Sequence, residues 1–375
     1  MNPALPHRSL ILRLFPFLEW LRGYSGEHLQ RDSLAGLTVA VVLIPQAMAY
    51  AMLAGMPPVY GLYAAAVTPA IAALWGSLRQ LATGPIAIMS LLVMTTLAPM
   101  AEPGSAEYVS LAFLLALMVG GLYLIVGLLR MGQVMAFISH SAVKGFTAAA
   151  ALIIISTQLP HLLGLKVEKH EYIFSMLVEI VRGLPGLHAP TAAVGFICFV
   201  IIYGLKRYRP QFPSGLTALA LASLATDLLE LDQKGISAIG RIPSGLPRPM
   251  LPGFDFEVAM GLLGPTVVIA LVSFAETYSV GKAVSSETRQ KVDVDQEFIG
   301  QGLANLVGSC FQCYPVSGSF SRTAINFGAG AKTGISSVVS CLIVVVALLF
   351  LTPLFAYIPR AALAALVISA VLLLF

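Results

Sequence analysis

The chain has 375 residues, of which 58% are hydrophobic and 11% are charged, and its mean hydropathy is +0.87. This composition excludes an ordinary soluble domain, in which about a quarter of the residues are charged. The net charge of +4 does not indicate a nucleic-acid-binding protein either, because the basic residues lie in loops between apolar segments, where they report membrane orientation.

The apolar segments predict a series of membrane spans. A bilayer core requires about 20 apolar residues per helix, and several segments are shorter than that. Residues 1–33 are interrupted by polar residues and predict a cytoplasmic N-terminal segment rather than a cleavable signal peptide. Residues 171–182 are apolar but also charged, which predicts a helix at the membrane interface. The candidate spans are residues 34–54, 58–75, 84–98, 109–129, 141–160, 189–205, 214–231, 262–281, 296–309, 319–330, 335–356 and 360–375.

Lysine and arginine gather in alternate loops between these spans. The loops on the opposite side are acidic or of mixed charge. The positive-inside rule therefore predicts that the N-terminus and the basic loops face the cytoplasm. The basic residues are Arg8, Arg13, Arg22, Arg31, Arg79, Arg130, Lys206, Arg207, Arg209, Lys282, Arg289 and Lys291.

The chain contains an internal repeat. Residues 36–50, "GLTVAVVLIPQAMAY", match residues 264–278, "GPTVVIALVSFAETY", at an offset of 228. A second match, "LWGSLRQ" over "LVGSCFQ", follows at an offset of 232. Seven spans separate the two copies, and an odd number means that matching spans cross the membrane in opposite directions. The sequence therefore predicts two inverted repeats, as in many transporters.

A third pair of matching segments is too short to cross the membrane. Residues 83–88, "TGPIAI", match residues 317–322, "SGSFSR", at an offset of 234. In each half, turn-forming residues are followed by a short run that is predicted to be helical. At 1.5 Å per residue, about a dozen residues cannot cross a core of about 30 Å. Each run is predicted to be a half-helix that begins inside the protein. Two such N-termini, with unpaired N–H groups and partial positive charge, predict an anion site near the midplane.

Four polar residues are candidates for this site. Arg322 lies in the second half-helix and would add a full positive charge. The alternatives are a structural ion pair, for which Glu276 in span 8 is the obvious partner, and a position that faces the cytoplasm. Glu276 is either a proton or cation coupling site or a structural counter-charge. Gln46 and Tyr50, one turn apart in span 1, either donate hydrogen bonds to an anion or stabilise the helix bundle.

The remaining motifs do not predict catalysis. The segment "GAGAKTG", residues 328–334, imitates a phosphate-binding loop, but Ala331 replaces the glycine required before the lysine and no strand precedes it. Cys310 and Cys313 form a lone CxxC without a second pair, so apolar packing is the better interpretation. We therefore expect no enzyme activity, no cofactor and no metal.

Two long stretches carry a family resemblance. They are "IPQAMAYAMLAGMPPVYGLYAAAVTPAIAALWGSLRQLATGPIAIMSLL", residues 44–92, and "DQEFIGQGLANLVGSCFQCYPVSGSFSRTAINFGAGAKTG", residues 295–334. Both are similar to the sulfate permease family, SulP, whose animal members include the anion exchangers and prestin. The resemblance implies an all-α polytopic membrane protein with a seven-plus-seven inverted repeat of the uracil-permease type, in which segments 3 and 10 are half-helices.

The resemblance also implies a division into a core and a gate domain. The core domain would comprise residues 34–132 and 256–356, and the gate domain residues 133–255 and 357–375. Because the chain ends at Phe375 within an apolar run, we expect the last two segments and a C-terminal STAS domain to be absent from this sequence. A homodimer through such a domain is the expected assembly.

The family's anion site falls on segments 1, 3 and 10 of this chain. Glu276 of segment 8 is similar to the acid that proton-coupled members carry there. The positions that the resemblance assigns to substrate are Gln46, Tyr50, Gly84, Pro85, Ile86, Ala87, Ser319, Phe320, Ser321 and Arg322.

The expected function is secondary active transport of a small anion. We expect proton-coupled uptake of sulfate or a small dicarboxylate across the bacterial inner membrane by an elevator-like mechanism. The alternatives are a sodium-coupled bicarbonate transporter, a nucleobase permease of the same fold, and a receptor or scaffold that transports nothing. Arg322 argues against a nucleobase, since a neutral ring would require acidic and amide partners, and a scaffold has no need of opposed half-helices.

Overall fold

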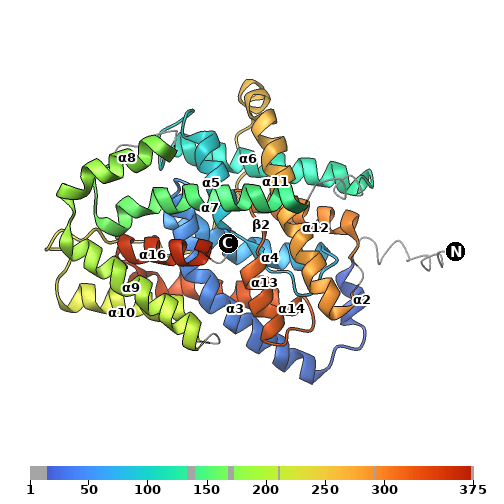
Figure 1. Ribbon diagram of the computed structural model, residues 1–375. Coiled ribbons are helices and arrows are strands. Elements are labelled where there is room, and N and C mark those ends of the chain that lie inside the picture. Colours follow the sequence, from blue (N-terminus) through green and yellow to red (C-terminus); the bar gives the residue numbers. More distant parts are fainter. Residues whose placement is uncertain (1–14, 133–139, 168–172, 210–211, 291, 373–375) are drawn as a thin grey trace.

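The computed structural model describes residues 15–132, 140–167, 173–209, 212–290 and 292–372. Residues 1–14 of the predicted N-terminal segment lie outside these ranges, as do Lys291, the start of the predicted gate domain at residue 133 and the last three residues of the final span. The described chain is mostly helical, with one pair of two-residue strands (Figure 1). The elements are α2 (Phe17–Leu21), α3 (Gly26–Leu53), α4 (Pro58–Trp75), β1 (Thr83–Gly84), α5 (Ala87–Leu97), α6 (Ala106–Leu128), α7 (His140–Leu163), α8 (Ile173–Gly183), η2 (Leu184–Gly186), α9 (Ala189–Tyr208), α10 (Ser214–Leu228), α11 (Phe256–Thr288), α12 (Val294–Cys310), β2 (Ser317–Gly318), α13 (Phe320–Gly328), α14 (Ile335–Val346), the π-helix η3 (Ala347–Leu351), α15 (Thr352–Phe355) and α16 (Arg360–Val371).

All twelve predicted spans coincide with helices. Seven helical segments of the described chain are long and apolar enough to cross a membrane, namely α3, α4, α6, α7, α9, α11 and the segment from α14 to α15. The helices α5, α10 and α16 are apolar but shorter, and α13 has only 9 residues. The protein is therefore a multi-pass membrane protein in which the predicted segments 3 and 10, α5 and α13, are half-helices.

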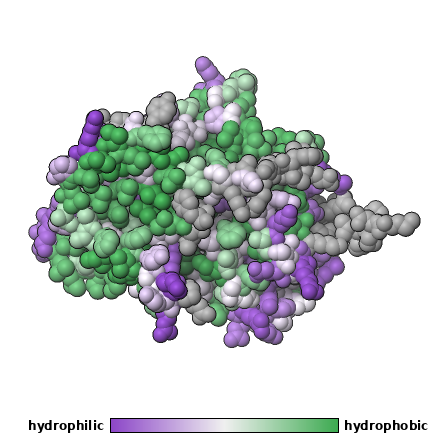
Figure 2. All heavy atoms as spheres, in the orientation of Figure 1, coloured by the Kyte–Doolittle hydropathy of each residue, from purple (hydrophilic) through white to green (hydrophobic). Residues whose placement is uncertain are grey.

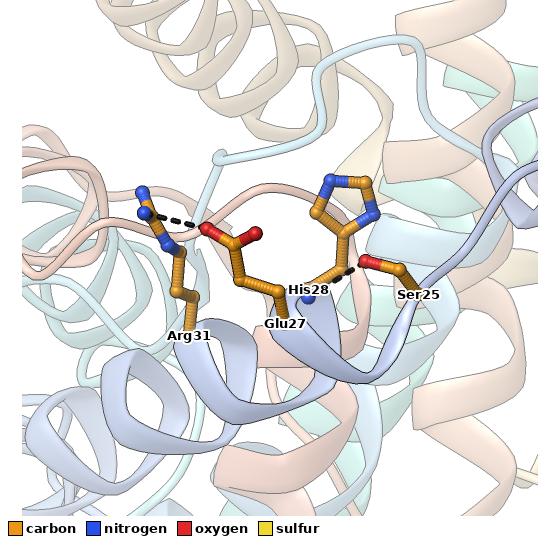
Figure 3. Close-up of polar contacts among 4 residues, drawn as sticks. All are labelled: Ser25, Glu27, His28 and Arg31. Carbon is orange, nitrogen blue, oxygen red and sulfur yellow. Dashed lines mark hydrogen bonds and ion pairs between the residues drawn. The ribbon is translucent and has the colours of Figure 1, made fainter.

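Two long helices begin before the apolar spans that they contain. Figure 3 shows the start of α3, where Ser25 Oγ accepts a hydrogen bond from the His28 N–H at 3.3 Å and Glu27 pairs with Arg31 at 2.7 Å. Similarly, Asp255 caps α11 by accepting from the Glu257 N–H at 2.9 Å. These N-caps satisfy first-turn donors outside the membrane, so hydropathy marks the extent of the bilayer and not the end of the helix.

The packing follows the inverted repeat. Elements that the repeat pairs contact each other directly: α4 packs on α12, β1 on β2, and α7 on α16. Contacts between other elements occur twice, once in each half of the repeat. The helix α3 packs on α14, and the repeat counterparts of these two helices, α11 and α6, also pack on each other. A pseudo-twofold axis requires this pattern, and it places the two strands at the centre of the protein.

The helices form two packed groups. The elements from α3 to α6 and from α11 to α14 pack mainly on one another, and so do α7, α9, α10 and α16. In the first group α3 and α4 approach so closely that a Cβ on Gly61 would overlap the carbonyl oxygen of Ala47. Figure 2 shows apolar side chains over the part of the surface where α8, α9 and α10 lie in Figure 1, as a surface in contact with lipid requires.

Candidate functional site

The site is built around the two short strands. The strands β1 and β2 pair antiparallel, with Thr83 opposite Gly318 and Gly84 opposite Ser317. The Ser319 N–H extends the pairing by donating to the Ala82 carbonyl at 2.9 Å. Because each strand leads directly into a half-helix, this pairing brings the N-termini of α5 and α13 together inside the protein, as the repeat predicted.

Gly84 is the residue that allows the chain to turn from β1 into α5. Its φ of +144° is a backbone conformation that residues with a side chain rarely adopt. A Cβ at this position would also lie 3.3 Å from Arg322 Nη2. The glycine therefore serves both the backbone turn and the close approach of the arginine.

The two half-helix N-termini differ in their capping. Ile86 precedes α5 with an extended backbone and provides no side-chain cap, so first-turn N–H groups of α5 have no helical acceptor. At α13, Ser319 Oγ accepts from the Arg322 N–H at 3.4 Å. The α5 N-terminus is therefore the stronger source of free backbone donors for an anion.

A cavity of about 60 Å³ lies between the half-helices. This volume holds a few water molecules, since one water needs roughly 10–15 Å³ on the same measure. It is also far below the roughly 300–1,000 Å³ of sites for drug-sized ligands. The residues that line it are Tyr50, Ile86, Ala87, Ile88, Glu276, Ser319, Phe320, Ser321, Ala370 and Val371.

Most predicted site residues line this cavity, but Gln46, Gly84, Pro85 and Arg322 do not. Three lining residues were not predicted from the sequence: Ile88 on α5 and the pair Ala370 and Val371, which bring α16 to the cavity. They are ordinary apolar residues in apolar runs, so no local sequence signal could have identified them.

Arg322 lies behind the cavity wall. Its side chain is only 1% exposed, which contradicts the alternative of a cytoplasm-facing position. Its Nη1 donates to Gln46 Oε1 at 3.4 Å, and its Nε and Nη2 have no hydrogen-bond partner among the described residues. Gln46 is thus a partner of the arginine and is not part of the cavity lining.

Glu276 reaches the same cavity from α11. Its Oε2 is buried and accepts no hydrogen bond from any residue that the structure describes. The expected ion pair with Arg322 is not formed within 4.0 Å in the described part of the chain, although the two groups are near enough to interact electrostatically. One acid and one base therefore face the region between the half-helices without neutralising each other by direct contact.

No other chemistry is evident at the site. In the ranges that the structure describes, no group of three or more His, Cys, Asp or Glu side chains could hold a metal ion. The four cysteines are free thiols. What the arrangement offers is backbone donors, hydroxyls and one buried positive charge on one side, and a carboxyl group on the other.

Comparisons with known proteins identify the family of this chain. The Sulfate permease family model matches residues 29–375. Sulfate transporter 4.1, chloroplastic, of Arabidopsis thaliana is 41% identical over 365 residues, which cover 96% of this chain and 53% of that protein. A Mycobacterium tuberculosis protein named as a probable sulfate transporter is 37% identical over 357 residues, which cover 95% of this chain and 64% of that protein. The chain thus spans about half to two thirds of the length of these relatives.

Solved structures confirm the predicted fold class. The murine Slc26a9 anion transporter in its inward-facing state superposes with a TM-score of 0.90 at 24% identity, covering 98% of this chain and 65% of that chain. The transmembrane domain of the cyanobacterial bicarbonate transporter BicA superposes with a TM-score of 0.85 at 22% identity, covering 94% and 89%. Because the family model extends over nearly the whole chain, including both half-helices, this protein belongs to the sulfate permease family.

Proposed function

We propose that the protein is a secondary active transporter that takes up sulfate or a small dicarboxylate together with protons. The observation that carries this proposal is the cavity at which the two half-helix N-termini meet in front of a buried, incompletely paired arginine. The names of the relatives, several of which are sulfate transporters, support the choice of an inorganic anion.

The anion would be held by several weak interactions that converge on the cavity. A helix N-terminus contributes roughly 0.3–1 kcal/mol, and up to about 2 kcal/mol where it is partly buried. The hydroxyls of Tyr50, Ser319 and Ser321 line the cavity and would donate hydrogen bonds. Arg322 would act through space, from behind the wall, and not as a direct ligand. The small cavity favours sulfate over the larger dicarboxylate and over a planar nucleobase.

Glu276 is the proposed coupling residue. An ionised carboxylate inside a membrane protein is costly unless it is paired, and one oxygen of Glu276 is buried with no partner in the described structure. An anion bound beside it would raise the cost of its negative charge further and would favour uptake of a proton. Anion and proton would then load together, and the loaded core would carry less charge across the membrane.

Movement of the loaded site would follow the two packed groups of helices. We propose that residues 34–132 and 256–356 form a core that slides against a gate of residues 133–255 and 357–375. Ala370 and Val371 belong to the gate side of the cavity, so relative sliding would uncover the anion. We further propose a cytoplasmic N-terminus, which the basic loops support, and a bacterial inner-membrane location, which the bacterial relative supports. We also propose a homodimer.

Uptake in liposomes tests the proposal. The purified protein would be reconstituted and offered radiolabelled sulfate, bicarbonate or fumarate under an inward proton gradient, an inward sodium gradient or neither. Concentrative sulfate or fumarate uptake that requires the proton gradient supports the proposal. Bicarbonate uptake that follows sodium would favour the alternative, which the structural similarity to a bicarbonate transporter brings forward. Uptake of uracil alone would reject anion transport.

A further inference from the structure

The helix α12 carries a stripe of buried polar side chains. Glu297, Gln301 and Asn305 are spaced by four residues, which places them one above another on the same face of the helix. Their side chains are 2%, 1% and 1% exposed. None of them lines the cavity. The N-cap of α12 is Asp293, whose Oδ1 accepts from the Gln296 N–H at 3.1 Å.

The first residue of the stripe holds the segment that leads into β1. Glu297 Oε2 accepts from the Ser77 N–H at 2.9 Å, from Ser77 Oγ at 3.0 Å and from the Leu78 N–H at 3.2 Å. Its other oxygen, Oε1, accepts from Gln301 Nε2 at 3.3 Å. The carboxylate thus connects the backbone after α4 to the next residue of the stripe.

The other two residues hold the two strands themselves. Gln301 Nε2 donates to Thr83 Oγ1 in β1 at 2.8 Å. Asn305 binds Val316, the residue before β2, at two points: Oδ1 accepts from the Val316 N–H at 2.9 Å, and Nδ2 donates to the Val316 carbonyl at 3.1 Å. One helix face therefore binds β1 and the residue before β2. The strand β2 is also held from α11, where Thr277 Oγ1 accepts from the Gly318 N–H at 3.2 Å and the Ser273 carbonyl accepts from Ser317 Oγ at 3.0 Å.

The strands require such support because they are only two residues long. A two-residue pair cannot define its own position, yet β1 and β2 determine where α5 and α13 begin. In the part of the chain that the structure describes, no side chain of α4, the repeat counterpart of α12, is seen to bond either strand, and Thr68 uses its hydroxyl to bind the Ala64 carbonyl of its own helix at 2.8 Å. The anchoring of the strands is asymmetric although the fold is a repeat.

We propose that Glu297, Gln301 and Asn305 are positioning residues of the anion site: they hold β1 and β2 on one rigid helix and so keep both half-helix N-termini directed at the cavity. The inference rests on the proposed anion binding for its functional consequence, but the anchoring itself is a property of the backbone. If the anchor at Gln301 is removed, β1 is released and α5 can withdraw its free N–H groups from the anion.

The chain offers a matched control on the same helix. Gln296 is also a buried glutamine of α12, and its Nε2 donates to the Trp75 carbonyl at the end of α4 at 2.7 Å. Gln301→Ala deletes a buried amide with its bonds to Thr83 and Glu297, and Gln296→Ala deletes a buried amide with its bond to the Trp75 carbonyl, so both should lower thermal stability. Only Gln301→Ala releases a strand.

Two measurements on the purified full chain separate the variants. In equilibrium binding with radiolabelled sulfate, Gln301→Ala should weaken affinity by about tenfold, because small displacements of an organised site are costly, whereas Gln296→Ala should stay within about twofold. In hydrogen–deuterium exchange, the amides of residues 83–84 and 317–319 should exchange faster in Gln301→Ala only. Thr83→Val breaks the same bond from the strand side and serves if Gln301→Ala does not fold, and Thr83→Ser, which retains the hydroxyl, should behave like the parent.

The outcomes distinguish the anchoring from the proposed function. If the parent binds sulfate and both alanine variants bind it equally well, with equal exchange at the strands, the positioning role is rejected. If the parent does not bind sulfate, the proposed substrate is wrong, and the exchange of the strand amides alone decides the anchoring. A double variant Gln301→Ala/Thr83→Val that binds more weakly than the parent by the sum of the two single effects would also contradict a shared bond.

Discussion

Replacing Arg322 by methionine should weaken anion binding without destabilising the protein. The guanidinium is 1% exposed, makes one long hydrogen bond, to Gln46, and leaves two nitrogens without partners in the described structure. Removing a buried charge that is poorly paired also removes its desolvation cost, so an apolar residue of similar length should be neutral or stabilising. A structural ion pair would give the opposite result for stability.

The size of the binding effect follows from Coulomb's law. Arg322 is buried and does not line the cavity, whereas Ser319, Phe320 and Ser321 of the same helix do. At a separation of roughly 8 Å and an effective dielectric constant of about 20, one positive charge contributes about 2 kcal/mol per unit of anion charge. The expected loss is therefore about 30-fold for a monovalent anion such as bicarbonate, and approaches 1,000-fold for divalent sulfate.

Calorimetric titration with both anions checks this dependence on charge. Lys332→Met is the control, because it removes an exposed positive charge from the loop that follows α13 and changes the net charge equally. It should leave both affinities unchanged. A loss in Arg322→Met that is the same for bicarbonate and sulfate would refute the through-space account, and a large fall in melting temperature would return Arg322 to a structural role.

Three further predictions concern an acid in the cavity and a clamp at the start of α3. Glu276→Gln should still bind sulfate and exchange sulfate for sulfate in liposomes, but an imposed proton gradient should no longer drive its uptake; unchanged gradient-driven uptake would move the coupling role elsewhere. Asp32→Ala should lower the free energy of unfolding by about 3 kcal/mol, measured by thermal melting. The buried carboxylate accepts hydrogen bonds from the Lys332 N–H at 2.6 Å, the Thr333 N–H at 3.1 Å and Thr333 Oγ1 at 2.5 Å. A melting temperature equal to the parent's would show that these three bonds are dispensable. Burial and the neighbouring Asp32 carboxylate raise the pKa of Tyr24, which lies before α3, to about 12. Since the folded protein then holds this proton more tightly than the unfolded chain, stability should fall as pH rises from about 10 to 12, and Tyr24→Phe should show a smaller fall in melts at those pH values.

The sequence determined most of the helices and their symmetry. Membrane spans are set by a local quantity, the length of an apolar run, so each predicted span proved to be helical. The match of residues 36–50 with 264–278 predicted the inverted repeat, because homologous halves retain local patterns even when their orientation is reversed. Gly84 and the serine and glycine residues at 317–319 marked the half-helix starts, since a turn inside an apolar region needs residues with few steric constraints.

Only the tertiary structure decided which side chains meet. Arg322 was expected to line the cavity or, as the alternative, to pair with Glu276, yet its side chain bonds Gln46 of α3, on which α13 packs. Ala370 and Val371 reach the cavity because α16 packs on α3, a contact between segments more than 300 residues apart in the chain. The hydrogen bond from Gln301 to Thr83 joins residues separated by 218 positions. A polar residue in a helix has several possible partners, and the choice among them is made by the packing of the whole chain.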